Sequence, residues 1–566
     1  MLKQPEPRLL VDTLILGVVG ALSAQLFTWM LRVCQGFFLT WLAGYQPPGL
    51  PGEPGPAQQV VGAHGLWLVP VATTLGGLIS GVLVFSLAPE AEGHGTDTVV
   101  KAFHRTAGFI RARVAPSKMV ASAITIGSGG AAGREGPIAL ISAGIGSIYA
   151  TLSRRSEEER RLLVLIGMAA GLSAIFRSPI GTAIFAVEVL YTDMEFEGSA
   201  LLYTMLASVV AYAVNGLFVG WHPLFQVPAT LGSPGFAAYG WYVLLGVASA
   251  LVATILPVVF YGLRDAFRAI PCLPHFKPAI GGLGVGLLAL KWPQVLGGGY
   301  GWMQQAIDGK LVLHLLLILL FAKVLAFALT VSSGGSGGVF APSLFVGAML
   351  GGSFSLLFHQ APAAFVIVGM AAVFGAAARV PIATLLMVTE MTGGYQLLVP
   401  AALAVMVSYL IQVRLADSLK YKSLYEAQVV ARAQSPAHYV DEVRAALILI
   451  GKHQLPSKAR VGHLDVLALL QSGIPLDLPH EKQLSMIVLP AGSLLIGKPI
   501  QNSYLDMAED EFEIMAVFRQ GEVLLPHPDT VLREGDRILV VTTPRVRAYL
   551  GHPLAVQADP PIRKMT

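Results

Sequence analysis

Long apolar runs separated by short polar segments occupy most of the first 430 residues of the chain. A helix needs roughly 20 apolar residues to cross the hydrocarbon core of a bilayer. Six runs reach about that length, at 9–42, 66–87, 201–219, 242–261, 311–331 and 397–413. The pattern predicts an all-α polytopic membrane region.

Other apolar runs are shorter and interrupted by glycine, at 138–150, 278–290 and 339–357. Broken or half-length helices of this kind are tolerated at membrane depth only where protein surrounds them. We therefore expect these three segments to lie inside the bundle.

The chain contains an internal repeat. The segments 133–137 (GREGP) and 338–342 (GVFAP) are each preceded by Ser-Gly-Gly, and their prolines are 205 residues apart (342 − 137). A second pair, 167–189 and 369–391, aligns at an offset of 202 (381 − 179). Two related halves with Gly- or Pro-interrupted helices at matching positions are typical of transporters, with the site between the halves.

Composition agrees with a membrane protein, because 54% of the 566 residues are hydrophobic and only 13% are charged. The first apolar run follows Lys3 and Arg8, which predicts an uncleaved first helix and a cytoplasmic N-terminus. The two cysteines, Cys34 and Cys272, give neither a disulfide framework nor a metal pattern. The net charge of +4 is small for this length, and we expect no nucleic-acid partner.

The sequence becomes soluble in character near Arg432. We predict a membrane domain at 1–432, with repeats at about 8–220 and 240–430, and a connector at 433–482. A small α/β cytoplasmic domain follows at 483–552, with strands at 484–489, 513–519 and 537–542, and a tail at 553–566.

The two Gly-x-x-x-Pro segments suit anion binding. The first N–H groups of a helix have no internal partner and carry partial positive charge. Glycine allows close approach of the backbone to an ion, and proline is tolerated in a first helical turn. We expect Pro137 and Pro342 to open helices from Ile138 and Ser343, with the glycine turns facing the ion.

These segments resemble the CLC family of chloride channels and chloride/proton antiporters over about residues 8–430. The resemblance implies a homodimer with one anion path in each subunit, and it identifies Glu135 as a gating glutamate that binds protons. Val339 and Phe340 would offer backbone N–H groups, and the hydroxyl of Tyr425 would close the intracellular side. Further residues of the anion-binding segments are Gly95, Arg134 and Gly136.

The first signature departs from the family's Gly-Ser-Gly-Ile-Pro and reads GHGTD at 93–97. His94 replaces the serine, and we hypothesise that it is an anion ligand whose protonation tunes binding or gating. In the alternative, His94 turns to water or to a backbone carbonyl. Thr96 or Asp97 can cap a helix over 98–103.

The second departure is Val189. Proton-coupled members of the family carry two successive glutamates where this chain has Glu188 and Val189. Val189 cannot carry a proton, which favours passive conduction over chloride/proton antiport. In the alternative, an antiporter uses another proton route, through Asp193, Glu195 or Glu197.

Two residue pairs of the repeat suggest structural roles. Glu188 and Glu390 occupy one repeat position, and we expect them to satisfy backbone donors or to pair within each half. Arg177 and Arg379, which also repeat, are interpreted in the same way.

The C-terminal region, about 483–552, resembles the C-terminal subdomain of RCK-type potassium-channel regulators. Such modules dimerise and can bind small regulatory ligands, so this region is either a sensor of an unknown small molecule or a dimer brace. It has no Gly-x-Gly-x-x-Gly motif after a strand, and we expect no nucleotide-binding half.

The sequence as a whole predicts a chloride transporter of the plasma (inner) membrane, with both termini cytoplasmic and no cofactor or metal. Nitrate or another halide is the alternative anion. An intramembrane enzyme using Ser128 or His94 is a weaker alternative, because a serine nucleophile needs a base held within hydrogen-bond reach.

Overall fold

The computed structural model describes residues 7–51, 55–228 and 235–432, together with residues between 435 and 546 that include the strands of the C-terminal region. It divides into two units, Met1–Ala437 and His438–Thr566. The predicted tail at 553–566 and most of the predicted connector at 433–482 lie outside the described residues.

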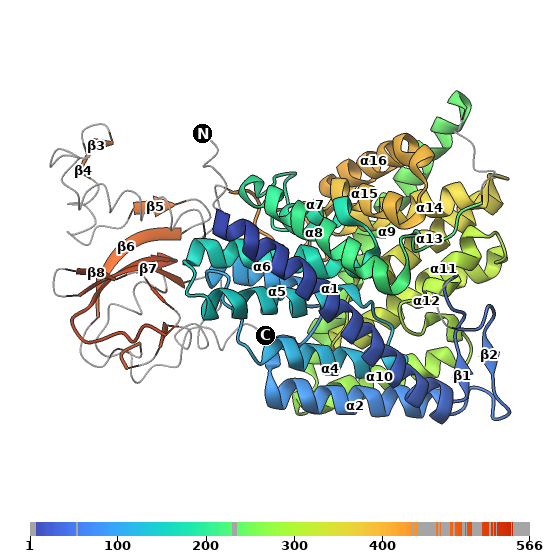
Figure 1. Ribbon diagram of the computed structural model, residues 1–566, viewed down its shortest axis with the longest axis horizontal. Helices are drawn as coiled ribbons and strands as arrows, with labels where there is room; N and C mark the ends of the chain where they lie inside the picture. The colour runs from blue at the N-terminus through green and yellow to red at the C-terminus, as the bar shows by residue number, and fades with distance from the viewer. Residues whose placement is uncertain are drawn as a thin grey trace. The chain divides into compact units, whose positions relative to one another are not determined.

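The first unit is built from sixteen α-helices among its described residues (Figure 1). Those of the first half are α1 (Pro7–Gln35), α2 (Val69–Leu87), α3 (Thr96–Arg105), α4 (Val114–Gly127), α5 (Glu135–Leu152), α6 (Glu157–Phe176), α7 (Pro179–Glu188) and α8 (Gly198–Val219). Those of the second half are α9 (Tyr239–Ala269), α10 (Lys277–Ala289), α11 (Tyr300–Ile307), α12 (Leu313–Ser332), α13 (Phe340–Leu357), α14 (Pro362–Ala377), α15 (Pro381–Thr392) and α16 (Leu398–Ala416). A π-helical turn, Gly36–Leu42, extends α1, and the short strands β1 (Tyr45–Gln46) and β2 (Val60–Val61) pair beyond it.

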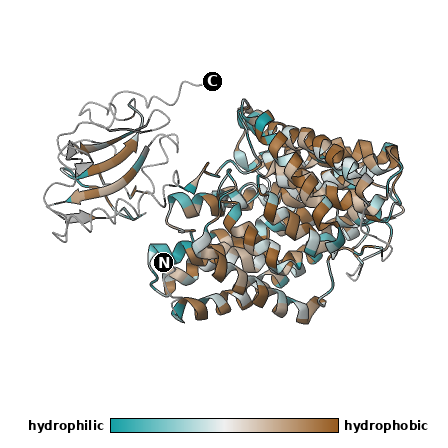
Figure 2. Cartoon of the chain, turned by 90° about the horizontal axis from the view of Figure 1, so that it is seen from above, coloured by the Kyte–Doolittle hydropathy of each residue, from teal (hydrophilic) through white to brown (hydrophobic). Residues whose placement is uncertain are grey.

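In the described part of the chain, seven helices are long and apolar enough to cross a membrane by length and composition. Six of them coincide with the six predicted long runs, and the seventh is α13. Hydrophobic residues, drawn in brown, occur throughout the helices of this unit (Figure 2). The prediction of a polytopic, mostly helical membrane protein is confirmed.

The helices of the two halves correspond in order, eight to each half. Matching helices also pack against each other, α2 against α10 and α7 against α15. The carboxyl end of α7 lies beside the amino end of α15, and the reverse also holds. Helices α7 and α15 therefore run antiparallel, as an inverted repeat requires.

The two helices behind the Gly-x-x-x-Pro segments begin earlier than predicted. We expected them to start at Ile138 and Ser343, but α5 starts at Glu135 and α13 at Phe340. Pro137 and Pro342 therefore lie inside the first turn. Because the first four N–H groups of a helix have no partner within the helix, proline is accommodated at these positions.

The C-terminal unit contains a five-stranded antiparallel sheet in the order β5-β6-β9-β7-β8. Its strands are β5 (Leu476–Leu478), β6 (Lys482–Val488), β7 (Phe512–Arg519), β8 (Glu522–Leu524) and β9 (Arg537–Thr542). The strands β6, β7 and β9 were predicted from the sequence, and the short edge strands β5 and β8 were not. Buried side chains such as Ile487, Val517 and Ile538 form the core of this unit.

Candidate functional site

Three signature segments of the sequence meet through their backbones. The N–H of Gly133 donates to the carbonyl of Gly338, the N–H of Gly338 donates back to Gly133, and both bonds are 2.7 Å long. The N–H of Gly337 donates to the carbonyl of Gly93. Residues more than 200 positions apart thus form one central core, which joins the two halves.

Glycine is required where these segments cross. A methyl group on Gly136 would overlap the carbonyl oxygen of His94, and one on Gly95 would lie 2.6 Å from the carbonyl oxygen of Gly136. Gly95 also has a φ of 87°, a left-handed conformation that side chains disfavour. Both predicted anion-site glycines therefore serve the close contact of α3 with α5.

A small cavity lies beside this core. Five of the predicted site residues line it: Glu135, Gly136, Val339, Phe340 and Tyr425, the last of which follows α16. Its remaining lining residues are Thr96, Leu172 and Phe185.

Glu135 is the first residue of α5, and its side chain is 1% exposed. Its carboxylate interacts with backbone N–H groups of Glu135 itself and of Ala341, the second residue of α13. Neither carboxylate oxygen has a hydrogen-bond partner of good geometry among the described residues. A carboxylate therefore stands at two helix N-termini, where an anion is favoured.

Aromatic rings enclose the cavity. The ring centroid of Phe340 lies 4.2 Å from that of Phe374 and 4.4 Å from that of Phe176. The ring of Phe185 lies 6.3 Å from both Phe340 and Tyr425. Tyr425 is 1% exposed and shares a side-chain hydrogen bond with Thr96.

His94 does not line the cavity. Its Nε2 lies 3.1 Å from Oδ2 of Asp97, three residues along the chain, so this nitrogen faces a carboxylate rather than a backbone carbonyl. Its ring centroid lies 5.4 Å from that of Tyr425. Thr96, which sequence reasoning treated only as a helix cap, occupies the lining position, and the role of His94 as an anion ligand stays a prediction.

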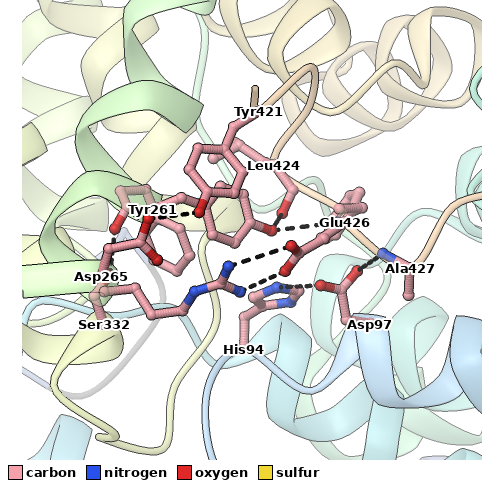
Figure 3. Close-up of polar contacts among 12 residues, drawn as sticks. His94, Asp97, Tyr261, Asp265, Ser332, Tyr421, Leu424, Glu426 and Ala427 are labelled. Carbon is pink, nitrogen blue, oxygen red and sulfur yellow. Dashed lines mark hydrogen bonds and ion pairs between the residues drawn. The ribbon is translucent and has the colours of Figure 1, made fainter. Parts of the chain in front are cut away.

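Asp97 does not cap α3 with its side chain as expected. Helix α3 starts at Thr96 without a side-chain cap, and Oδ1 of Asp97 accepts the backbone N–H of Ala427 at 3.2 Å (Figure 3). The segment that carries Tyr425 is thereby joined to α3. Tyr261 of α9 holds it from another direction, donating to the carbonyl of Leu424 and accepting from the N–H of Glu426.

The other predicted residues lie around this centre. The guanidinium of Arg134 lies 5.0 Å from the ring centroid of Tyr300, and Val189 is fully buried at the end of α7. Ser128 donates to the carbonyl of Thr125, so it is not paired with His94 as an enzyme would require. Among the described residues, no group of three His, Cys, Asp or Glu side chains could hold a metal ion.

Two buried lysines were missed by sequence reasoning. The ammonium of Lys118 donates to the carbonyls of Ala91 and Gly93, at 3.0 and 2.6 Å. Lys323 donates in the same way to Val295 and Gly297, both at 2.7 Å. The two lysines are 205 residues apart (323 − 118), the offset of the Gly-x-x-x-Pro segments, so the repeat itself could have identified them.

Comparison with known proteins identifies the two parts of the chain. A family model described as "Voltage gated chloride channel" matches residues 76–413, and one described as "TrkA-C domain" matches residues 484–551. A relative named "H(+)/Cl(-) exchange transporter ClcA", from Salmonella agona (strain SL483), is 31% identical over 388 residues, covering 66% of this chain and 80% of the relative. A protein of the same name from Cronobacter sakazakii (strain ATCC BAA-894) is 30% identical, with 65% of this chain and 81% of the relative covered.

Solved structures share the fold. A CLC-type fluoride/proton antiporter superposes with a TM-score of 0.63 at 23% identity, covering 75% of this chain and 98% of the other. A slow cyanobacterial Cl⁻/H⁺ antiporter gives the same TM-score at 21% identity, with 75% and 97% covered.

Proposed function

Because the chain belongs to the voltage-gated chloride channel (CLC) family, we propose that it carries chloride across a membrane in exchange for protons. The curated relatives at 30–31% identity are named H⁺/Cl⁻ exchange transporters, which supports exchange over the passive conduction favoured by the sequence. The proposal includes a homodimer with one path in each subunit, in a plasma (inner) membrane with both termini cytoplasmic.

The position of Glu135 carries the proposal. Its buried carboxylate stands at the N-terminus of α5 and beside that of α13, the places best suited to a chloride ion. The charged carboxylate of Glu135 excludes the chloride ion from these N–H groups. When it is protonated it has no charge, and the ion can displace it. Chloride movement and protonation of Glu135 therefore depend on each other.

The rest of the cavity suits an anion that must bind and then leave. Val339 and Phe340 stand at the N-terminus of α13, where N–H groups carry partial charge. The buried ammonium groups of Lys118 and Lys323 donate to backbone carbonyls, and neither side chain lines the cavity. Partial charges therefore bind the ion weakly enough for it to be released.

Val189 supports passive conduction as the second candidate function. It is fully buried and cannot accept a proton at the place where exchangers of the family carry a glutamate. Under this alternative, protonation of Glu135 opens the path and no protons are carried through it.

The test is simultaneous recording of chloride efflux and external pH with the protein in proteoliposomes. For exchange, a chloride gradient drives protons uphill, and Glu135→Gln abolishes this proton movement. For passive conduction, the current reverses at the chloride equilibrium potential whatever the pH gradient. Absence of chloride flux contradicts both functions.

Two controls complete the experiment. Glu158→Gln, an exposed change on α6, should leave both fluxes unaltered. Replacing chloride with nitrate or another halide tests the alternative anions.

We also propose that the C-terminal unit regulates the path. The match to a TrkA-C domain at residues 484–551 supports a module that dimerises or binds a small molecule. We expect chloride flux to persist after removal of residues 438–566, and we expect its regulation to change.

A further inference from the structure

The exchange proposed above needs a second proton-accepting group, because Val189 cannot be one. The two buried acidic side chains near it in sequence, Glu188 and Glu197, are engaged. Both oxygens of Glu188 accept backbone N–H groups of α15, at 3.1 and 2.6 Å. Glu197 accepts the hydroxyls of Tyr191 and Ser199 and pairs with Arg432. Protonating either group would disrupt these contacts.

His94 has what these glutamates lack, an unused basic nitrogen. An ionised carboxylate can only accept hydrogen bonds, so the hydrogen between Nε2 of His94 and Asp97 belongs to the imidazole. Nδ1 is then the unprotonated nitrogen. It is buried, the residue is 6% exposed, and Nδ1 has no hydrogen-bond partner in the described part of the chain.

Asp97 is held in place at the start of α3. It lies in the first turn of α3, where a negative charge is favoured by the helix N-terminus. Its Oδ1 accepts the N–H of Ala427 while its Oδ2 faces His94, as Figure 3 shows. Its side chain is 24% exposed, so the pair is in contact with solvent.

We propose that His94 and Asp97 together form the second proton-accepting site of the exchanger. A neutral imidazole beside a carboxylate carries a charge of −1, and the protonated pair carries none. A glutamate changes its charge in the same way when it binds a proton. The pair therefore replaces, at another position, the glutamate that Val189 removes, and the inference rests on the exchange function proposed above.

Tyr425 connects this pair to the cavity. Its ring lies 5.4 Å from that of His94, and the same side chain lines the cavity with Glu135. Tyr425 also interacts electrostatically with both Asp97 and Glu135. A proton that binds Nδ1 of His94 from the solvent side leaves it for the Glu135 carboxylate, by way of water or of the Tyr425 and Thr96 hydroxyls, and neutral imidazole is restored.

The surrounding charges are largely paired with other groups. Arg264 of α9 forms an ion pair with Glu426 at 2.5 Å, and Lys118 of α4 is bound to backbone carbonyls. Asp97 is thus the charge in direct contact with the imidazole. The charged and titratable groups packed around the pair are Glu92, Lys118, Tyr261, Arg264, Tyr425 and Glu426.

The experiment compares proton and chloride fluxes in proteoliposomes for the intact protein, His94→Gln and Asp97→Asn. Glutamine keeps a donor toward Asp97 but cannot take up a proton. We expect both variants to pass chloride while coupled proton movement falls about a hundredfold, the low end of what a positioned proton-transfer group contributes. Adding Val189→Glu to His94→Gln should restore coupling.

Asp265→Asn is the matched control. Asp265 belongs to the same polar network in Figure 3 but binds Tyr421 and Lys420, so its loss should leave coupling intact. Asp97→Asn also alters the contact with Ala427. If that variant loses chloride flux, His94→Gln decides the question by itself.

The outcomes separate the two proposals. Normal coupling in both variants, with coupling in the intact protein, overturns the role of the pair and leaves exchange standing. Chloride flux without proton movement in the intact protein overturns exchange, and the role of the pair with it.

Discussion

Glu188 and Glu390 each accept hydrogen bonds from the first turn of the helix that carries the other. Glu188, at the end of α7, accepts the N–H groups of Ile382 and Ala383 in α15. Glu390, in the last turn of α15, accepts those of Ile180 and Gly181 in α7. The expectation that they satisfy backbone donors agrees with this geometry, but the contacts cross between the halves and do not stay within each half.

This reciprocal capping predicts a structural effect of mutation. Replacing Glu188 with alanine leaves buried N–H groups of α15 without acceptors, and each such loss costs about 1–3 kcal/mol. We expect the free energy of unfolding in detergent, measured by denaturant titration, to fall by at least that amount. Glu158→Ala, at an exposed position of α6, should leave it unchanged.

The same contacts predict that Glu188→Gln, which keeps one acceptor oxygen, destabilises less than the alanine variant. It should also retain the proton-to-chloride ratio. A ratio that collapses in Glu188→Gln while stability is normal would assign Glu188 to the proton route instead.

The close contact of Gly136 with the backbone of His94 predicts that a single added methyl group abolishes function. In Gly136→Ala the new methyl would overlap the backbone carbonyl of His94, which cannot move away without breaking the contact of α3 with α5. We expect chloride flux in proteoliposomes to be lost.

The matched control is Gly262→Ala in α9, where the added methyl would meet no atom within 4 Å beyond its chain neighbours and the backbone of its own helix. This change should preserve flux and stabilise the helix by about 0.5–1 kcal/mol. Equal flux in both alanine variants would mean that the crossing of α3 and α5 tolerates displacement.

The long helices and the internal repeat could be predicted from the sequence, because hydrophobic length and chain offset are local or periodic signals. The positions of Glu135, Val339 and Phe340 together in one cavity also followed from matching motifs. The contact of Asp97 with Ala427 did not, since it joins residues 330 positions apart that share no pattern. The starts of α5 and α13 were predicted too late, because we placed them after Pro137 and Pro342, whereas the first turn of each helix accommodates its proline.

The C-terminal unit should lose stability in acid. Hydrogen bonds from the Arg519 guanidinium, at 2.8 and 2.6 Å, lower the pKa of the Asp536 carboxyl below its usual 3.8. A carboxyl with a lowered folded-state pKa stabilises the fold above its unfolded pKa. That contribution declines as the pH falls below about 3.8 and is lost once the pH passes the folded-state pKa.

Hydrogen-exchange protection of β7 and β9, corrected for intrinsic rates, measures this effect in the full chain. In the intact protein, this protection should decline as the pH falls. In Asp536→Asn, we expect weaker protection at neutral pH and a smaller loss of protection in acid. An identical acid profile for both proteins would show that the pair with Arg519 does not contribute.

Tyr425 offers a test of the cavity's polar wall. Its hydroxyl shares a hydrogen bond with Thr96, and both residues line the cavity with Glu135. Tyr425→Phe keeps the buried ring and removes a donor to a bound anion, and a hydrogen bond to a charged group contributes about 1.5–3 kcal/mol. We expect chloride affinity, measured by isothermal titration calorimetry, to weaken at least about tenfold. Tyr395→Phe, at a position 61% exposed, is the control, and equal affinities in the two variants would exclude the Tyr425 hydroxyl as an anion ligand.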